Sequence, residues 1–105
     1  MSASDLPRPV GKIRPVRLTG ALIPWAADDQ PAVVQWPGSA QLYLPCFTSA
    51  SDLIAEMAGA AIPIAKIKRI EDGPEFLSSI PGNIIVILDL CTERGRVRFT
   101  QVLRD

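Results

Sequence analysis

The stretch Leu42–Leu53, LYLPCFTSASDL, constrains the fold of this chain more than any other. A short apolar strand pattern ends in Pro-Cys-Phe, and a hydroxyl-rich turn then leads into residues with helical spacing. Ser49 has Asp52 three residues further on, which is the spacing of a capping box. The stretch therefore predicts a strand that passes directly into a helix, so the fold combines strands and helices.

Three short strand patterns, the last within this stretch, precede the helix. Polar turns separate them, which favours an antiparallel meander. They cover Arg17–Pro24, Ala32–Trp36 and Gln41–Pro45. After the helix, further strand patterns alternate with one short helix that begins at Asp72-Gly73-Pro74. These later strands are Ile64–Ile70, Ile84–Leu88 and Arg96–Leu103.

Two of these strands differ in how they are expected to be buried. Ile84–Leu88 is an unbroken aliphatic run, typical of an interior strand that is covered on both faces. Ile64–Ile70 carries lysines, which are typical of sheet edges. We therefore expect an α+β fold: a single mixed β-sheet of about five to six strands, an N-terminal antiparallel meander, and two helices on one face.

A chain of 105 residues is expected to form one domain. Residues 1–16 are rich in proline and basic side chains and show little apolar pattern, which favours a flexible arm. The residues concerned are Pro7, Arg8, Pro9, Lys12, Arg14 and Pro15. Residues 17–105 then form a single α/β domain, and the arm is interpreted either as a solvated tail or as a basic clamp for an acidic partner.

The charge balance excludes several classes of protein. Eleven basic and eleven acidic residues cancel, whereas nucleic-acid binders depend on a surplus of Lys and Arg. No apolar run is long enough to span a membrane, and the first twenty residues lack the apolar core of a signal peptide. We expect a cytoplasmic protein that binds neither nucleic acid nor membrane.

The chain contains two cysteines, Cys46 and Cys91, and no histidine. This inventory does not supply a zinc site, and we expect neither a metal nor another cofactor. Both cysteines adjoin apolar runs, and free cysteine is among the most buried residue types. The sequence therefore predicts two buried, reduced and slowly reacting thiols with no disulfide.

The run Leu42–Ser49 resembles the N-terminal domain of the SseB family, the enhanced serine-sensitivity proteins. In that family a strand ends in a Pro-x-Phe-Thr/Ser element, a helix follows, and a later apolar strand precedes a closing hairpin. The likeness covers residues 17–103, although Ile84–Leu88 continues into Asp89-Leu90 where the family commonly has Asn-Pro. The resemblance implies a small bacterial α/β module without an established catalytic activity.

Candidate binding residues fall into three groups. Trp25 and Trp36 are interpreted either as anchors for a protein partner or as core residues. Arg96 and Arg98 lie on the last strand, whose free edge is expected to pair with a second copy, giving a homodimer, or to meet an acidic partner. The hydroxyls of Thr48-Ser49-Ala50-Ser51 either cap the helix or cradle an anion at its N-terminus.

Catalytic chemistry has one weak candidate. Asp89 ends the most buried strand, and Cys91 follows two residues later, so both are expected at one sheet edge. We expect Asp89 to cap or hydrogen-bond the turn at Thr92–Gly95 rather than to act as a base. The sequence favours a non-catalytic protein-interaction module of a bacterial cell, of adaptor, secretion-associated or immunity type. The alternatives are a small-ligand or anion-binding domain at Thr48–Ser51 and a minor enzyme using Asp89 and Cys91.

Overall fold

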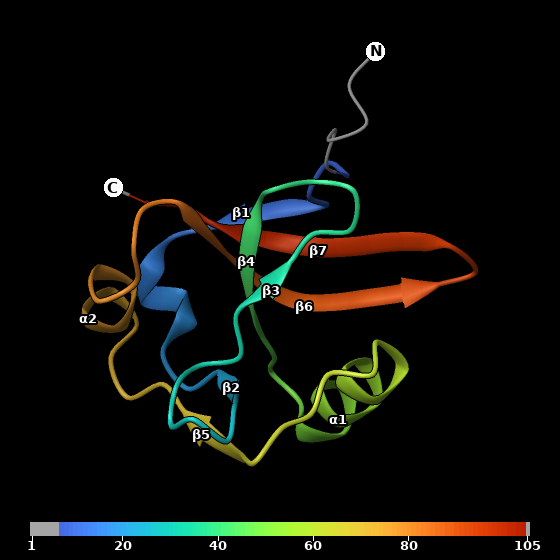
Figure 1. Cartoon of the computed structure of the whole chain (residues 1–105). Coiled ribbons are helices and arrows are strands. Elements are labelled where there is room, and N and C mark those ends of the chain that lie inside the picture. The colour runs from blue at the N-terminus through green and yellow to red at the C-terminus, as the bar shows by residue number, and fades with distance from the viewer. Residues whose placement is uncertain (1–6, 105) are drawn as a thin grey trace.

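The computed structural model describes residues 7–104 and combines strands with two α-helices (Figure 1). This confirms the expected α+β class. In chain order the elements are β1 (Gly11–Ile13), the 3₁₀-helix η1 (Pro15–Leu18), β2 (Leu22–Trp25), β3 (Val34–Gln35), β4 (Leu42–Cys46), α1 (Ala50–Gly59), β5 (Lys66–Arg69), α2 (Gly73–Ser78), β6 (Ile84–Glu93) and β7 (Arg96–Val102).

The main sheet has the strand order β1-β7-β6-β4-β3. β6 pairs with β4 in parallel and with β7 in antiparallel orientation, so the prediction that Ile84–Leu88 is interior is confirmed. The β6–β7 hairpin turns at Arg94-Gly95, where φ is 53° and 77°. Two consecutive positive φ values suit a two-residue hairpin loop. In Figure 1 this hairpin extends to the right, beyond the body of the molecule.

A second, two-stranded sheet replaces part of the expected single sheet. β2 pairs with β5 in antiparallel orientation, with Trp25 opposite Lys66 and Leu22 opposite Arg69. The predicted meander is therefore correct for β3 and β4 but wrong for β2, which meets the end of β4 only at an isolated bridge between Leu22 and Phe47. Since β3 and β6 occupy the two edges of β4, no edge remains for β2. The lysine-bearing β5 is an edge strand, as expected.

The predicted N-terminal arm is part of the fold from Val10 onward, which corrects that prediction; residues 1–6 lie outside the described residues. β1 pairs in parallel with β7, with Gly11 opposite Thr100 and Ile13 opposite Val102. Ile13 also packs against a buried cluster. Through β1, the backbone of β7 forms hydrogen bonds along its second edge. These hydrogen bonds order a segment that its prolines suggested would be flexible.

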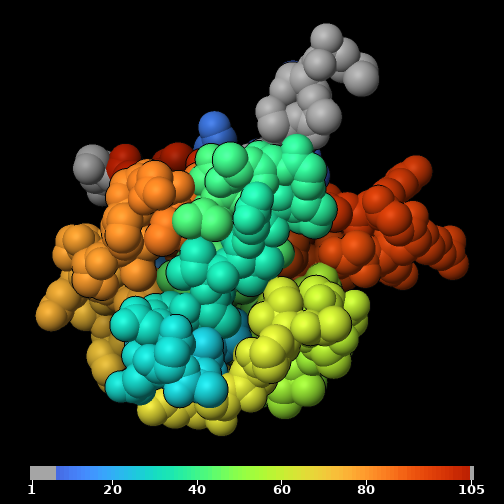
Figure 2. All heavy atoms as spheres, in the orientation of Figure 1, coloured from blue at the N-terminus to red at the C-terminus, as the bar shows by residue number. Residues whose placement is uncertain are grey.

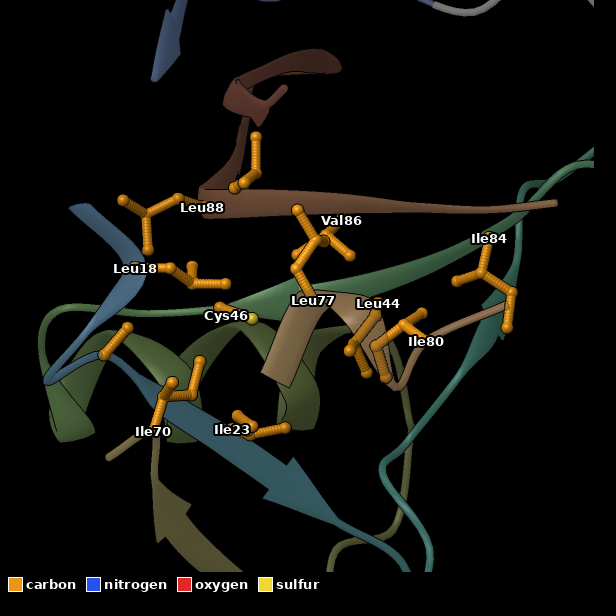
Figure 3. Close-up of a cluster of buried hydrophobic side chains, with 12 residues drawn as sticks. Leu18, Ile23, Leu44, Cys46, Ile70, Leu77, Ile80, Ile84, Val86 and Leu88 are labelled. Atoms are coloured by element: carbon orange, nitrogen blue, oxygen red, sulfur yellow. The ribbon is translucent and has the colours of Figure 1, made fainter. Parts of the chain in front are cut away.

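The two helices cover opposite faces of the main sheet, not one face as expected. Val86 and Leu88 of β6 belong to the cluster beside η1 and α2, which Figure 3 shows. Ile87 and Leu90 belong to the cluster that contains Leu53 of α1. An unbroken aliphatic strand has two apolar faces, and each needs its own cover.

Local signals set the ends of both helices as the sequence predicts. The Ser49 hydroxyl accepts a hydrogen bond from the Asp52 amide at 3.4 Å, and Asp72 accepts one from the Glu75 amide at 3.1 Å. Gly73 permits α2 to pack closely on η1, because a Cβ atom there would overlap the carbonyl oxygen of Pro15. Among residues 7–104, no helix is long and apolar enough to cross a membrane.

Candidate functional site

An open surface groove of about 910 Å³ lies beside the small sheet. Three segments that are distant in sequence form it: the loop after β2, the connection after α1, and the end of α2 with the start of β6. We call it the Trp25 groove. Its apolar lining includes Trp25, Ala32, Ile62, Pro63, Phe76, Ile80 and Ile84. In Figure 2 the loop after β2 (cyan) lies below the segment that enters β6 (orange) on the left of the molecule.

Trp25, at the end of β2, is a half-buried wall of the groove and is held by its neighbours. The indole N–H donates to Asp29 Oδ1 at 3.1 Å, and the Lys68 ammonium lies 4.0 Å from the ring centroid. Lys66 Nζ donates to the same Asp29 oxygen at 3.2 Å. The Lys66 ammonium and then the Trp25 N–H lower the pKa of the Asp29 carboxyl, because both stabilise its charged form. The aromatic wall therefore has a fixed orientation.

The facing wall is also held, by the side chain of Arg104. Its guanidinium donates to the carbonyl oxygens of Leu77 at 3.4 Å, Ile80 at 3.0 Å, and Pro81 and Ile84 at 2.9 Å each. These carbonyls lie in the last turn of α2, in the segment after it and at the start of β6, and the last carbonyls of a helix lack helical hydrogen-bond partners. Arg104 thus ties the segment between α2 and β6 into one shape, and Ile80, Pro81 and Ile84 present their side chains to the groove.

A second, smaller groove of about 310 Å³ adjoins the first and shares Trp25, Phe76 and Ser79 with it. Its remaining lining is mixed in charge, with Lys68 and Arg69 from β5 and Asp72 and Glu75 around the start of α2. Lys66 and Lys68 are therefore engaged with Asp29 and Trp25 rather than forming a free basic ridge. Trp25 stands where the two grooves meet.

The second predicted anchor, Trp36, has a core role. Its ring packs edge-on against Tyr43, with centroids 5.1 Å apart, and against Phe99 at 6.2 Å. It is half-buried and packs against the buried cluster on the α1 side of the main sheet. Trp25 is half-buried too and packs against the other cluster, but it also lines the surface groove, whereas Trp36 contacts aromatic residues of the core.

The hydroxyls of Thr48–Ser51 are engaged within the chain. The Thr48 amide and hydroxyl donate to Asp89 Oδ1 at 2.9 and 3.0 Å, and the hydroxyl also lies 3.1 Å from Oδ2. Ser49 caps α1, and its hydroxyl lies 2.9 Å from that of Ser51. A carboxylate of the protein itself therefore stands beside the hydroxyls that were the candidate anion cradle.

Asp89 and Cys91 do lie together, in an open groove of about 390 Å³ between α1 and β6. The Asp89 carboxylate accepts a hydrogen bond from Thr48, which follows β4, the parallel neighbour of β6. Its partner is therefore not the hairpin turn that we expected. Both carboxylate oxygens accept hydrogen bonds from Thr48, so Asp89 connects β6 to the residues that follow β4. Within residues 7–104, no cluster of His, Cys, Asp and Glu could hold a metal ion.

The cysteines differ from the expectation in one respect. Both are free, and Cys46 is fully buried in the core, where burial raises the pKa of its thiol. Cys91 is exposed, so the prediction of a buried thiol is wrong there. It ends the register shift between Leu88 and Cys91, lies on the projecting hairpin and lines the open groove beside α1.

Arg96 and Arg98 are exposed on the same hairpin, opposite Glu93 and Cys91. The prediction of a free edge on the last strand is wrong for the second half of β7, because β1 pairs with it there. The structure therefore leaves these arginines accessible but removes much of the edge that was expected to join two copies.

No family model, curated protein or solved structure matches this chain. The resemblance to the SseB family accordingly stays a prediction.

Several groove residues had no signal in the sequence. Phe76 and Ile80 are recognisable as the apolar side of a short helix, but nothing in the pattern places them beside Trp25. Arg104 follows the last strand and is unremarkable in sequence, since its partners are backbone carbonyls. The groove emerges only when three distant segments come together.

Proposed function

We propose that this protein is a non-catalytic protein-interaction module that binds a segment of a partner protein in the Trp25 groove. The observation that carries the proposal is the groove itself, about 910 Å³ in volume and largely apolar, with a half-buried tryptophan as its wall. Tryptophan is enriched among the residues that dominate binding energy at protein interfaces.

The groove is suited to a protein segment because its lining is largely apolar and both of its walls are braced. Asp29 and Lys68 hold Trp25, and Arg104 holds the facing segment. A site that is already ordered costs less conformational entropy on binding than one that must form.

The two alternatives have less support from the geometry. An enzyme using Asp89 and Cys91 would need the Asp89 carboxylate as a base, but Thr48 already donates to both of its oxygens. An anion at Thr48–Ser51 would meet the negative charge of the same carboxylate. Neither site offers the apolar contact area that the Trp25 groove provides.

The wider expectations belong to this proposal as well: an SseB-like bacterial module, located in the cytoplasm. Self-association stays a prediction, but its basis is now the exposed start of β7 alone, because β1 pairs with the rest. Light scattering at tens of micromolar protein tests self-association. A molar mass close to that of one chain at every concentration would contradict a dimer.

The proposal is tested by selecting binders from a displayed library of random dodecapeptides on the immobilised full chain. We expect enriched peptides whose binding falls at least tenfold in Trp25→Ala. Ile54→Ala is the matched control, because Ile54 is a large exposed side chain, 52% accessible, on α1 outside the groove. Peptides that bind wild type and Trp25→Ala equally, or no enrichment at all, would contradict the proposal.

A further inference from the structure

We propose that the occupant of the Trp25 groove is an extended protein segment with an apolar side chain against Trp25 and Phe76 and a Lys or Arg side chain against Asp28. This inference rests on the function proposed above and adds the chemistry of the partner. It follows from the distribution of charge around the groove and from the shape of the loop after β2.

The rim of the groove carries two acidic residues, Asp28 and Asp29, at the tip of that loop. Backbone hydrogen bonds close the loop, from the Ala26 amide to the Gln30 carbonyl at 2.8 Å and from the Asp29 amide to the Ala26 carbonyl at 3.2 Å. Asp29 has a positive φ of 61°, which turns the chain back toward the groove. The backbone thus holds both acidic residues at the rim of the groove.

Only one of the two acidic charges is compensated. Asp29 pairs with Lys66 and also accepts the Trp25 N–H. Asp28 is exposed and has no ion-pair partner among residues 7–104. The lining of the groove contains no Lys or Arg, because Lys68, which lies over Trp25, lines the second groove. Asp28 is therefore the charged residue of this lining that has no ion-pair partner among the described residues.

A bound segment with a basic side chain near its apolar anchor would complement this charge, and one with an acidic side chain would be repelled. Charges at the rim of an interface contribute more to selecting the partner than to affinity, because water screens them. The apolar contact with Trp25 and Phe76 supplies the affinity, and Asp28 determines which segments are preferred. The two contributions are therefore separable by mutation.

The experiment uses the same dodecapeptide library, selected in parallel on wild type and on Asp28→Lys. We expect the wild-type pool to be enriched in Lys or Arg next to an aromatic or aliphatic residue. An individual wild-type peptide should bind Asp28→Lys about three- to tenfold more weakly, and the loss should shrink at high salt. Glu93→Lys is the control: it makes the same charge change at an exposed residue of the β6–β7 hairpin.

The possible results separate this inference from the proposed function. The selected peptides could depend on Trp25 but lack basic residues, or could bind Asp28→Lys as tightly as wild type. Either result would overturn the role of Asp28 and leave the proposed function of the groove intact. Peptides that do not depend on Trp25 would overturn both. An equal loss in Glu93→Lys would show that net charge, and not Asp28, selects the peptides, and would also overturn the inference.

Discussion

The two sheets of this protein are built from different kinds of sequence. In the main sheet, β4 and β6 run in parallel through the interior, and most of their side chains are buried, including Leu44, Val86 and Ile87. In the small sheet, three of the four β5 residues are exposed, whereas only the middle of β2, Ile23 and Pro24, is buried. The main sheet supplies most of the interior strands, and the small sheet presents Trp25 to the groove.

The difference teaches that stability and proposed function occupy separate parts of this chain. The interior strands are held by burial, which tolerates few changes. Trp25 packs against the core on one side only, and a hydrogen bond to Asp29 and the Lys68 ammonium hold it near the surface. We therefore expect substitutions in β4 and β6 to unfold the protein, and substitutions around Trp25 to alter binding with little loss of stability.

The two thiols should show the largest contrast between interior and surface. Cys91 is exposed and should react with a thiol reagent at nearly the rate of the denatured protein, whereas Cys46 is fully buried and should react at least about a thousandfold more slowly. Reaction rates of Cys91→Ser and Cys46→Ala, each retaining one thiol, measure this separately. Fast labelling of Cys46 in native Cys91→Ser would contradict the assignment of β4 to the interior.

Ile87→Ala should cause the next largest effect. Ile87 is 0% exposed at the centre of β6, and truncating such a side chain costs about 2–5 kcal/mol of the free energy of unfolding. Urea denaturation followed by circular dichroism measures the loss. Ile54→Ala, on exposed α1, should change stability by less than about 0.5 kcal/mol. Similar losses in the two variants would remove the distinction between core and surface.

Arg104→Ala should have an intermediate effect, and it should lower both stability and peptide binding. The guanidinium bonds four carbonyls around the end of α2, and its loss should cost about 1–2 kcal/mol of stability, since water replaces part of those bonds. Binding of a library peptide should weaken as well, because Ile80 and Ile84 lose their fixed position. Arg94→Ala, on the hairpin turn, should change neither property.

The smallest effect should be a pH step at Trp25. The folded-state pKa of Asp29 is lowered from its ordinary value of 3.8, so its favourable contacts are present above that value and are lost as the pH falls through the lowered folded pKa. Trp25 fluorescence, isolated in Trp36→Phe, should therefore be constant from pH 7 to about 4 and change below. The same variant with Asp29→Asn should lack the step. A step that survives would assign it to another carboxyl group.

The strength of local signals explains how much of the fold was predictable. The aliphatic run at Ile84–Leu88, the cap at Ser49 and the Asp72-Gly73-Pro74 helix start are local, and all three are confirmed. The partner of β2 was not predictable, because its choice of β5 depends on which edges of β4 are already occupied. The strand at Gly11–Ile13 was missed for the same reason: pairing with β7 is a tertiary effect, and its sequence reads as an arm.

The candidate site was less predictable than the fold. Trp25 and Trp36 look alike in sequence, and only their neighbours in space distinguish a groove wall from a core residue. The bond from Thr48 to Asp89 requires knowing that β4 and β6 are adjacent and parallel. Exposure of Cys91 depends on the irregularity before it and on its place in the hairpin that projects from the body of the molecule.

The most direct test of the account is a map of where a selected library peptide binds, from amide chemical shifts of the ¹⁵N-labelled protein. We expect the largest shifts at residues 25–33, 62–63 and 76–84, which form the Trp25 groove, and little change at the β6–β7 hairpin. Trp25→Ala should abolish these shifts while the rest of the spectrum stays folded. Shifts centred on α1 and residues 89–98, with residues 25–33 unchanged, would contradict the central claim that the small sheet presents the binding surface.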